Sequence, residues 1–204
     1  MNPNKKQKTK TQPTPKLRRI LVPVDFSDAS GKAVTAAVAL AKRFSARLAL
    51  VHVTPPKGRP GSHGAFELAG MTTDPRRPAR EKLAGFARDN VPEEIEVTRL
   101  VESGVAYKHI ASAASDWEAD LILIATHGSG SLAHAFLGST AERVVRHAPC
   151  PVLVLRGRKK GGTNSAFLSS PIRSVLLTTD FSENSLTAFP HAVAWAREFG
   201  AKLV

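Results

Sequence analysis

The sequence predicts an α/β fold in which a five-stranded, parallel, doubly wound sheet carries helices on both faces, followed by an incomplete second copy of the same fold. Two observations predict it. Short apolar runs rich in β-branched residues alternate along the chain with segments whose apolar residues have helical spacing. In addition, a stretch near the N-terminus recurs near the C-terminus. Strands that alternate with helices need right-handed crossover connections, which make the strands parallel.

The strands are expected where apolar runs are bounded by turn residues, at Ile20–Val24, Arg47–Val53, Ile95–Val101, Leu121–Ala125 and Val152–Leu155. Helical spacing predicts helices between them, at Ala29–Phe44, from Asp74 to about Asn90, at Val105–Trp117 and at Gly138–His147. Ser27 or Asp28 is a suitable N-cap for the first helix. Asp74 is a suitable N-cap for the second, because Pro75 then occupies the first helical position. The stretch from Pro55 to Thr73 has no sustained period, which predicts a long loop that could serve as a lid.

The chain divides into a disordered basic tail, a complete domain, a linker and the start of a second domain, at residues 1–17, 18–156, 157–170 and 171–204. Shifting residues 18–49 by 155 positions onto residues 173–204 gives fourteen identities in thirty-two positions without a gap. One strand and one helix cannot close a core. We therefore expect the truncated second copy to dock on something or to be loosely ordered.

The composition is that of a globular protein, with 204 residues, 42% hydrophobic and 23% charged. The longest nearly apolar run, Ala33 to Ala41, is too short for the roughly 18–20 residues of a membrane span. The N-terminus lacks the apolar segment of a secretory signal, and a single cysteine cannot form an internal disulfide. We therefore expect a cytoplasmic protein with no membrane partner.

The net charge of +12 is confined to two segments. Residues 1–19 hold seven basic and no acidic residues, and residues 156–173 hold five basic and no acidic residues. The rest of the chain is balanced, with 17 residues of each sign. A fold that binds DNA carries its positive stripe on the ordered surface, so nucleic acid is an unlikely partner except through weak binding by the tails.

The strongest site signal is the motif Ala125-Thr126-His127-Gly128, followed after nine residues by Gly138-Ser139-Thr140-Ala141-Glu142. In open α/β sheets, ligands bind outside the carboxyl ends of the strands. The pattern Ser139-x-x-Glu142 predicts a capping box, so that a helix with free N–H groups begins there and favours an anion. Gly128 and Gly138 lack a Cβ and allow close approach of a phosphate or a positive φ. The hydroxyls of Ser139 and Thr140 add donors, and His127 is a candidate within the same loop.

Phosphate contacts alone are too weak for tight binding. A helix terminus contributes about 0.3–2 kcal/mol, whereas micromolar affinity needs about 8 kcal/mol. An apolar pocket for a base is also required, and the strand ends at Val24-Asp25 and His52-Val53 are expected beside the same crevice. Asp25 can accept hydrogen bonds from an amino group or a ribose hydroxyl. The alternatives are that Asp25 only caps the first helix and that the glycines only form a tight turn.

Catalysis is not expected. Phosphoryl transfer needs Lys, Arg or a protein-held metal, yet no Lys or Arg lies between Gly128 and Gly138, and the chain has no GxxxxGK[ST] motif. The histidines His52, His63, His127 and His134 have no metal-ligand spacing. Cys150 lies between two prolines and is expected to be a packed small residue. At most, slow hydrolysis of a bound nucleotide is expected.

These motifs resemble the universal stress protein family, its UspA-like branch. The resemblance covers residues 18–156 through ILVPVDFSDAS, LALVHV, ADLILIATHG and FLGSTAERVVRHAPCPVLVL, and it returns in SVLLTTDFSENS. It implies a Rossmann-like fold of the adenine-nucleotide α-hydrolase type. The family's nucleotide-binding signature, Gly-x2-Gly-x9-Gly-[Ser/Thr], falls on Ala125, Gly128, Gly138 and Ser139, with alanine in place of the first glycine.

The resemblance also implies a ligand and a role for each site residue. Asp25 and the backbone at Val53 would meet adenosine, Ala125 the ribose, and Gly128, Gly138, Ser139 and Thr140 the phosphates of ATP. Val24, which directly precedes Asp25, is a further candidate for binding the cofactor. A divalent ion such as Mg²⁺ or Mn²⁺ would be held through the phosphates. The resemblance further implies a homodimer through the edge strand near Val152–Leu155.

The leading hypothesis is therefore an ATP-binding or adenine-nucleotide-binding stress factor that acts as a sensor or regulator. The alternative is a protein-interaction and dimerisation module of the same fold that has lost nucleotide binding and works through its β edge and its basic segments.

Overall fold

A computed structural model describes residues 17–56, 74–126, 138–155 and 172–204. The chain divides into two compact units, and the described residues 17–155 belong to the first and 172–204 to the second. Most of the predicted tail, the predicted loop to Thr73 and the predicted linker lie outside the described residues, as do His127 and Gly128. No helix in the described ranges is both long and apolar enough to cross a membrane.

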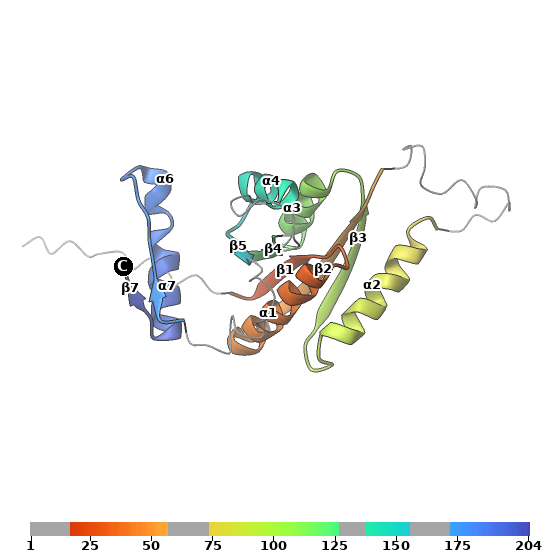
Figure 1. Ribbon diagram of the computed structural model, residues 1–204, viewed down its shortest axis with the longest axis horizontal. Helices are drawn as coiled ribbons and strands as arrows, with labels where there is room; N and C mark the ends of the chain where they lie inside the picture. Colours follow the sequence, from red (N-terminus) through yellow and green to blue (C-terminus); the bar gives the residue numbers. More distant parts are fainter. Residues whose placement is uncertain (1–16, 57–73, 127–137, 156–171) are drawn as a thin grey trace, which may run out of the picture. The chain divides into compact units, whose positions relative to one another are not determined.

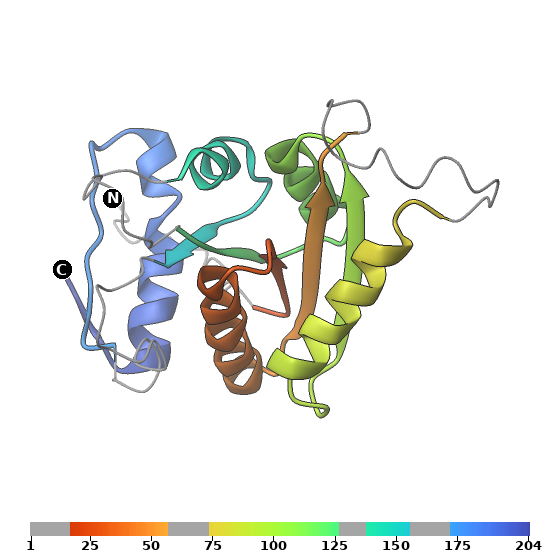
Figure 2. The ribbon, with the colours of Figure 1, turned by 45° about the vertical axis from the view of Figure 1, so that its right-hand side comes forward.

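The first unit is built on a five-stranded sheet of order β3-β2-β1-β4-β5 in which every pair is parallel. Figure 2 shows β2 and β3 side by side with the same direction. The chain winds outward from β1 to one edge and then from β4 to the other, so the doubly wound prediction is confirmed. The strands are β1 (Arg19–Pro23), β2 (Arg47–Thr54), β3 (Val97–Ser103), β4 (Leu121–Ala125) and β5 (Val152–Leu155).

Helices cover both faces of this sheet because its central strands are apolar on both sides. Ile20, Leu21 and Val22 are consecutive and fully buried. α1 and α2 lie on one face, and α3 and α4 lie on the other (Figure 1). The helices are α1 (Asp28–Phe44), α2 (Arg77–Asn90), α3 (Ala106–Asp116) and α4 (Ser139–His147).

The core on the second face joins β1, β2 and β4 to α3 and α4. Its members are buried and interlocked, and they include Leu21, Val51, Ile122, Ile110 and Val144. Ala141 and Val144 are the buried residues of α4, so this short helix is held to the sheet by its apolar stripe. The packing fixes where the first turn of α4 lies relative to the ends of β1 and β4.

Two predicted helix starts are wrong. α2 begins at Arg77, with Arg76 as its N-cap and Pro78 in its first turn, so Asp74 and Pro75 lie before the helix. The Asp74 carboxylate instead accepts a hydrogen bond of 3.0 Å from Arg76 N–H and one of 2.7 Å from the Arg80 guanidinium. A proline is equally well tolerated one residue further into the first turn, because its missing N–H would have no partner within the helix.

The predicted capping box on α4 is also wrong. Gly138 is the N-cap, with φ −54° and ψ 145°, and no side chain of the described residues caps the helix. Ser139 has already entered the helix, so its hydroxyl is not at the cap position. Glu142 bonds the Arg146 guanidinium at 3.0 Å, one turn along, instead of reaching back.

The second unit repeats the local structure of the β1–α1 segment. β6 (Ser174–Val175) pairs in parallel with β7 (Lys202–Leu203), and the register matches that of β1 with β2 after a shift of 155 residues. Where the first unit has one helix, the second has two, α6 (Glu183–Leu186) and α7 (Phe189–Phe199). The helix divides just before Pro190, whose ring would clash with a preceding carbonyl in a continuous helix.

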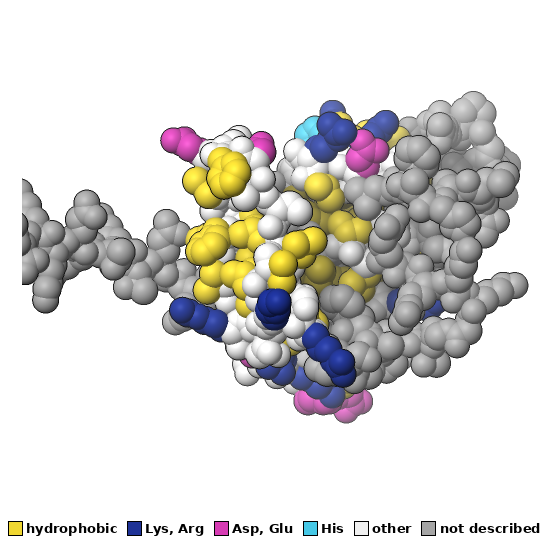
Figure 3. Space-filling view, turned by 60° about the vertical axis from the view of Figure 1, so that its left-hand side comes forward, with side chains coloured by type: hydrophobic (Ala, Val, Ile, Leu, Met, Phe, Trp, Pro, Cys, Tyr) yellow, Lys and Arg dark blue, Asp and Glu magenta, His cyan; other side chains and the backbone are white. Residues whose placement is uncertain are grey.

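Large apolar side chains remain at the surface of the second unit. Phe181 is 84% exposed and Leu176 is 72% exposed, whereas the equivalent Leu21 of the first unit is fully buried. Figure 3 shows hydrophobic side chains at the surface of the described residues. Two short strands and two helices therefore leave apolar groups uncovered, as expected for a segment too small to close a core.

Cys150 carries the only thiol of the chain, and its burial raises its pKa from an ordinary 9.0 to about 11, with the Asp120 carboxylate adding to the effect. We expect iodoacetamide at pH 8 to alkylate the folded protein about a hundredfold more slowly than the denatured protein, because only the thiolate reacts. Because folding raises the pKa of Cys150, the protonated thiol adds to the free energy of unfolding. This addition is complete below pH 9.0 and is lost as the pH rises to about 11. Equal alkylation rates in the folded and denatured protein would contradict the raised pKa of Cys150.

Candidate functional site

A cavity opens at the carboxyl edge of the sheet, between the ends of β1, β2 and β4 and the N-termini of α1, α3 and α4. It gathers seven of the nine predicted site residues from four separate stretches of the chain, and these are Val24, Asp25, Val53, Ala125, Gly138, Ser139 and Thr140. The other two, His127 and Gly128, lie outside the described residues. The prediction that these distant strand ends and loop residues share one crevice is therefore confirmed for the residues that the structure describes.

The end of β1 forms a tight turn that presents Asp25 to the cavity. Val24 N–H continues the ladder with a 2.8 Å bond to the Val51 carbonyl. The Asp25 carboxylate accepts hydrogen bonds from Ser27 N–H at 3.0 Å and from the Ser27 hydroxyl at 2.6 Å. Ser27 is the N-cap of α1, and its Oγ accepts from Ser30 N–H at 3.2 Å. Asp25 thus braces the cap rather than serving as the cap itself.

The end of β2 contributes two neighbouring side chains from opposite faces of the sheet. Val53 lies on the face covered by α3, where it packs against the core. The His52 ring Nδ1 lies 2.7 Å from the Val24 carbonyl oxygen, so the side chain ties the end of β2 to the end of β1. The predicted crevice includes the tip of β2, but sequence reasoning gave the His52 side chain no role there.

The end of β4 and the start of α4 form the polar side of the cavity. Ala125 is the last residue of β4, and Thr126 is buried, with its N–H donating to the Leu155 carbonyl at 2.9 Å. Across the cavity, Ser139 and Thr140 are exposed in the first turn of α4. Because no described side chain caps this helix, its N–H groups and the positive end of its dipole favour an anion there.

Gly138 allows a ligand to approach the backbone closely, and it does not adopt an unusual backbone conformation. Its φ of −54° is accessible to any residue, so the predicted use of a positive φ does not apply at this position. The absence of a side chain at the mouth of the cavity is what glycine provides. Ala125 is likewise absent from the described residues with positive φ, so its extra methyl group imposes no backbone strain.

The wall of the cavity is otherwise apolar and is supplied partly by residues that sequence reasoning missed. Ala106 and Ile110 from α3 and Ala141 from α4 join Val51 and Ile124. The sequence could have indicated these α3 residues, because α3 begins directly after the end of β3 and must therefore start at the carboxyl edge of the sheet. Among the described lining residues, the ionisable side chains are Asp25 and His52, with no Lys or Arg. The described residues contain no cluster of ligands for a metal ion.

Comparison with known proteins identifies the family of this chain. Residues 16–156 match the family model described as the universal stress protein family. The chain belongs to the universal stress protein family. The matched region spans all five strands and the four helices of the first unit.

Two curated relatives and one solved structure cover the same region. A universal stress protein of Methanocaldococcus jannaschii is 33% identical over 70% of this chain and 84% of its own length. A universal stress protein of Thermus aquaticus is 34% identical over 68% of this chain and 98% of its own length. The crystal structure of a universal stress protein family member from Burkholderia pseudomallei is 27% identical, with a TM-score of 0.50, over 68% of this chain and 96% of its own.

The Ser27 cap supports both α1 and Asp25, so its loss should be measurable. We expect Ser27→Ala to lower the free energy of unfolding by about 1 kcal/mol, because the Ser30 N–H loses its acceptor. That change corresponds to a fall of roughly 2–4 °C in the melting temperature, measured by calorimetry. Ser182→Ala removes the equivalent cap from the second unit and serves as the control, with no shift expected in the main transition. An unchanged melting temperature for Ser27→Ala would refute the role of the cap.

Proposed function

We propose that this universal stress protein binds an adenine nucleotide in the cavity at the carboxyl edge of its sheet and acts as a sensor or regulator in a stress response. The observation that carries the proposal is the convergence of Asp25 and Val53 with Ala125, Gly138 and Ser139 in one cavity. These are the positions at which the family resemblance places the adenosine, the ribose and the phosphates.

Two chemically different sides of the cavity suit the two ends of a nucleotide. The N-terminus of α4, with the hydroxyls of Ser139 and Thr140, offers donors and a positive dipole end to phosphates. The apolar wall, which includes Val51, Ile110 and Ile124, suits a purine, whose burial supplies the affinity that phosphate contacts lack. The proposed ligand is ATP. The resemblance implies a divalent ion held through its phosphates, and the described lining offers no ligand cluster of its own for that ion.

We further propose that the protein holds the nucleotide without transferring its phosphate. Transfer requires a cation at the developing charge and a positioned nucleophile. The described lining residues include no Lys or Arg to meet that charge. A bound nucleotide would therefore serve as a signal of the state of the cell rather than as a substrate.

Gly138→Val tests the nucleotide site. We expect ATP, titrated calorimetrically in the presence of magnesium, to bind the variant at least tenfold more weakly, because a branched side chain would occupy the mouth of the cavity. The valine can adopt the Gly138 backbone angles, so the fold should be retained.

Gly85→Val is the matched control for that experiment. Gly85 lies in α2, outside the cavity lining, and a Cβ there would meet the end of the Arg88 side chain at 3.8 Å, an ordinary van der Waals contact. Its ATP affinity should equal that of the natural protein. The absence of any ATP, ADP or AMP binding by the natural protein would reject the proposed function and favour an interaction module.

Residues 171–204 are proposed to be the start of a second domain of the same family. The repeated turn supports this assignment, because Asp180 accepts from Ser182 N–H at 2.9 Å, as Asp25 does from Ser27 N–H. Phe26 and Phe181 also share a φ of 63°. The pKa of Asp180 is lowered to about 2, chiefly because the Ser182 side chain donates a hydrogen bond to the carboxylate.

We propose a homodimer that forms through β5, as the resemblance implies. β5 is an edge strand with one neighbour, β4, among the described strands. The Pro151 carbonyl accepts a hydrogen bond of 3.0 Å from Ile122 N–H in β4, and the Leu155 carbonyl accepts one of 2.9 Å from Thr126 N–H, directly after β4. Backbone groups of a strand alternate in direction, so the N–H of Val154 faces the open edge, where a second copy can pair.

Val154→Pro tests this interface. Proline removes the outward N–H of Val154 without removing a bond to β4, so we expect at least tenfold weaker dimerisation in sedimentation velocity. Arg99→Pro makes the same change at an outward position of β3, the opposite edge, and should leave the dimer intact. A dimer that survives in Val154→Pro, or a natural protein that is monomeric, would count against pairing through β5.

A further inference from the structure

Phe26 occupies a backbone conformation that is costly for a bulky residue. Its φ is 63°, in the left-handed region, where the Cβ of a non-glycine residue comes too close to the backbone. Two other described residues with positive φ, Ser45 and Glu118, lie at the C-terminal ends of α1 and α3, where this conformation commonly ends a helix. Phe26 lies instead before an N-cap, between the end of β1 and the start of α1. Its conformation therefore belongs to the turn that carries Asp25.

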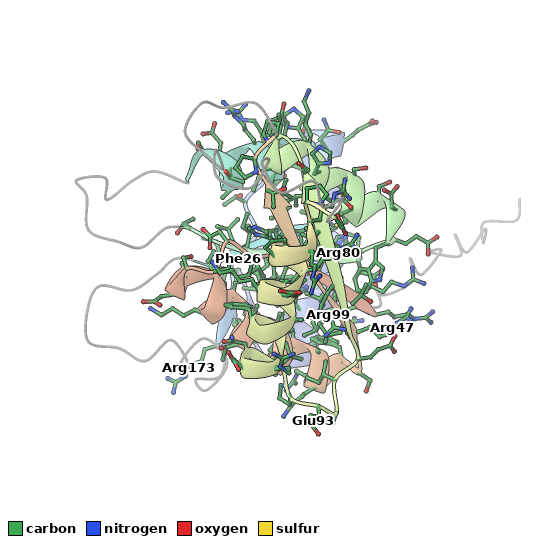
Figure 4. All side chains as sticks on the ribbon, turned by 90° about the vertical axis from the view of Figure 1, so that its right-hand side faces the viewer. Phe26, Arg47, Arg80, Glu93, Arg99 and Arg173 are labelled. Atoms are coloured by element: carbon green, nitrogen blue, oxygen red, sulfur yellow. The ribbon has the colours of Figure 1, made fainter. Side chains whose placement is uncertain are left out.

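The Phe26 side chain is held by three residues from two neighbouring elements. Its ring centroid lies 4.4 Å from that of His52 in β2 and 5.7 Å from that of Phe86 in α2, the latter with an edge-to-face angle of 76°. The Lys82 ammonium lies 4.3 Å from the ring centroid, within the range of a cation–π contact. Figure 4 labels Phe26 beside α2. We call His52, Lys82 and Phe86 the Phe26 cage.

The cage connects α2 to the cavity through a residue that does not line it. Phe26 is absent from the described lining, whereas its neighbours Asp25 and Ser27 both belong to it. The two hydrogen bonds from Ser27 to the Asp25 carboxylate span Phe26, so rotation of the Phe26 backbone would break them. His52 also binds the Val24 carbonyl, at 2.7 Å. The cage thus fixes the chain on both sides of Asp25.

The second unit contains the same turn without the cage. Phe181 has the same φ of 63°, and its neighbours make equivalent bonds, yet its side chain is 84% exposed. The Phe181 N–H also donates to the Thr179 hydroxyl at 2.9 Å, a bond that Val24 cannot offer to Phe26. Local hydrogen bonds are therefore enough to define the turn in the second unit. What the cage adds in the first unit is an anchor that resists movement of Phe26, through two ring contacts and one cation–π contact.

We propose that Phe26 is a positioning residue of the nucleotide site, which holds the Asp25 carboxylate in its binding orientation because the cage clamps the Phe26 ring against β2 and α2. This inference rests on the proposed nucleotide binding. It assigns α2, which contributes no described residue to the cavity lining, a role in ligand affinity.

The test is a double-mutant cycle on the full chain, with ATP affinity measured by calorimetry. Phe26→Leu keeps an apolar side chain but loses the aromatic and cation–π contacts, and we expect about tenfold weaker binding. In the Asp25→Asn background, the same change should weaken binding less than twofold, because the carboxylate that Phe26 positions is already gone. Phe26→Tyr keeps the ring and should restore natural affinity.

Two further variants separate positioning from general stability. Phe86→Leu opens the cage from α2 without altering the turn, and it should weaken ATP binding severalfold. This variant keeps the inference testable if Phe26→Leu does not fold. Phe181→Leu makes the matched change in the turn that has no cage, and affinity should not change.

The possible outcomes distinguish this inference from the proposed function. If the natural protein binds no adenine nucleotide, the proposed function fails and the inference falls with it. If the natural protein binds ATP and the Phe26 and Phe86 variants bind it equally well, the inference alone is overturned. An equal loss of affinity for Phe26→Leu in the natural and Asp25→Asn backgrounds would also overturn it, since Phe26 would then act through general stability rather than through Asp25.

Discussion

The larger unit depends on the burial of β1 and β4 at the centre of a parallel sheet. Strands that are apolar on both sides need helices on both faces, and parallel strands need a helix to return the chain each time. Each crossover therefore delivers a strand end and a helix start to the same edge. Backbone carbonyls, helix N–H groups and turn side chains collect there as a consequence of topology. The cavity between Val24, Val53 and Ser139 is formed by the same arrangement that buries Ile20 and Ile122.

The sequence was sufficient to predict the fold because four of the strands are short apolar runs bounded by turn residues. The exception is β3, which was predicted at Ile95–Val101 and lies two residues later, at Val97–Ser103, because Thr98, Arg99 and Glu102 interrupt its apolar pattern. β4 and β5 have the predicted bounds, and the parallel direction of all five strands follows from their alternation with helices. Helix starts were harder to place, because several residues near each start can serve as a cap. At α4, glycine takes the cap position and leaves Ser139 one residue inside the helix. At α2, the cap position falls after Pro75, and Pro78 instead occupies the first turn, where its missing N–H would have no partner within the helix.

The parts of the candidate site that lie at strand ends could be predicted from the sequence. The parts that depend on contacts between distant side chains could not. Asp25, Val53 and Ala125 were predicted because strand ends must meet at one edge. The contacts of Phe26 with Phe86 and Lys82 join residues about sixty positions apart, and no local pattern indicates that they touch. The sequence repeat did identify the turn itself, since Asp-Phe-Ser occurs in both copies. It could not reveal that one phenylalanine is enclosed and the other is exposed.

Thr126 connects the carboxyl ends of two neighbouring strands, β4 and β5. Both its N–H and its hydroxyl donate to one acceptor, the Leu155 carbonyl, at 2.9 Å and 3.4 Å. The first residue after β4 is thereby fastened to the last residue of the edge strand. Any displacement of that strand must either stretch this double attachment or carry the start of the following segment with it. A partner that pairs with β5 would therefore lie one hydrogen-bonded residue away from Thr126, which directly follows the cavity residue Ala125.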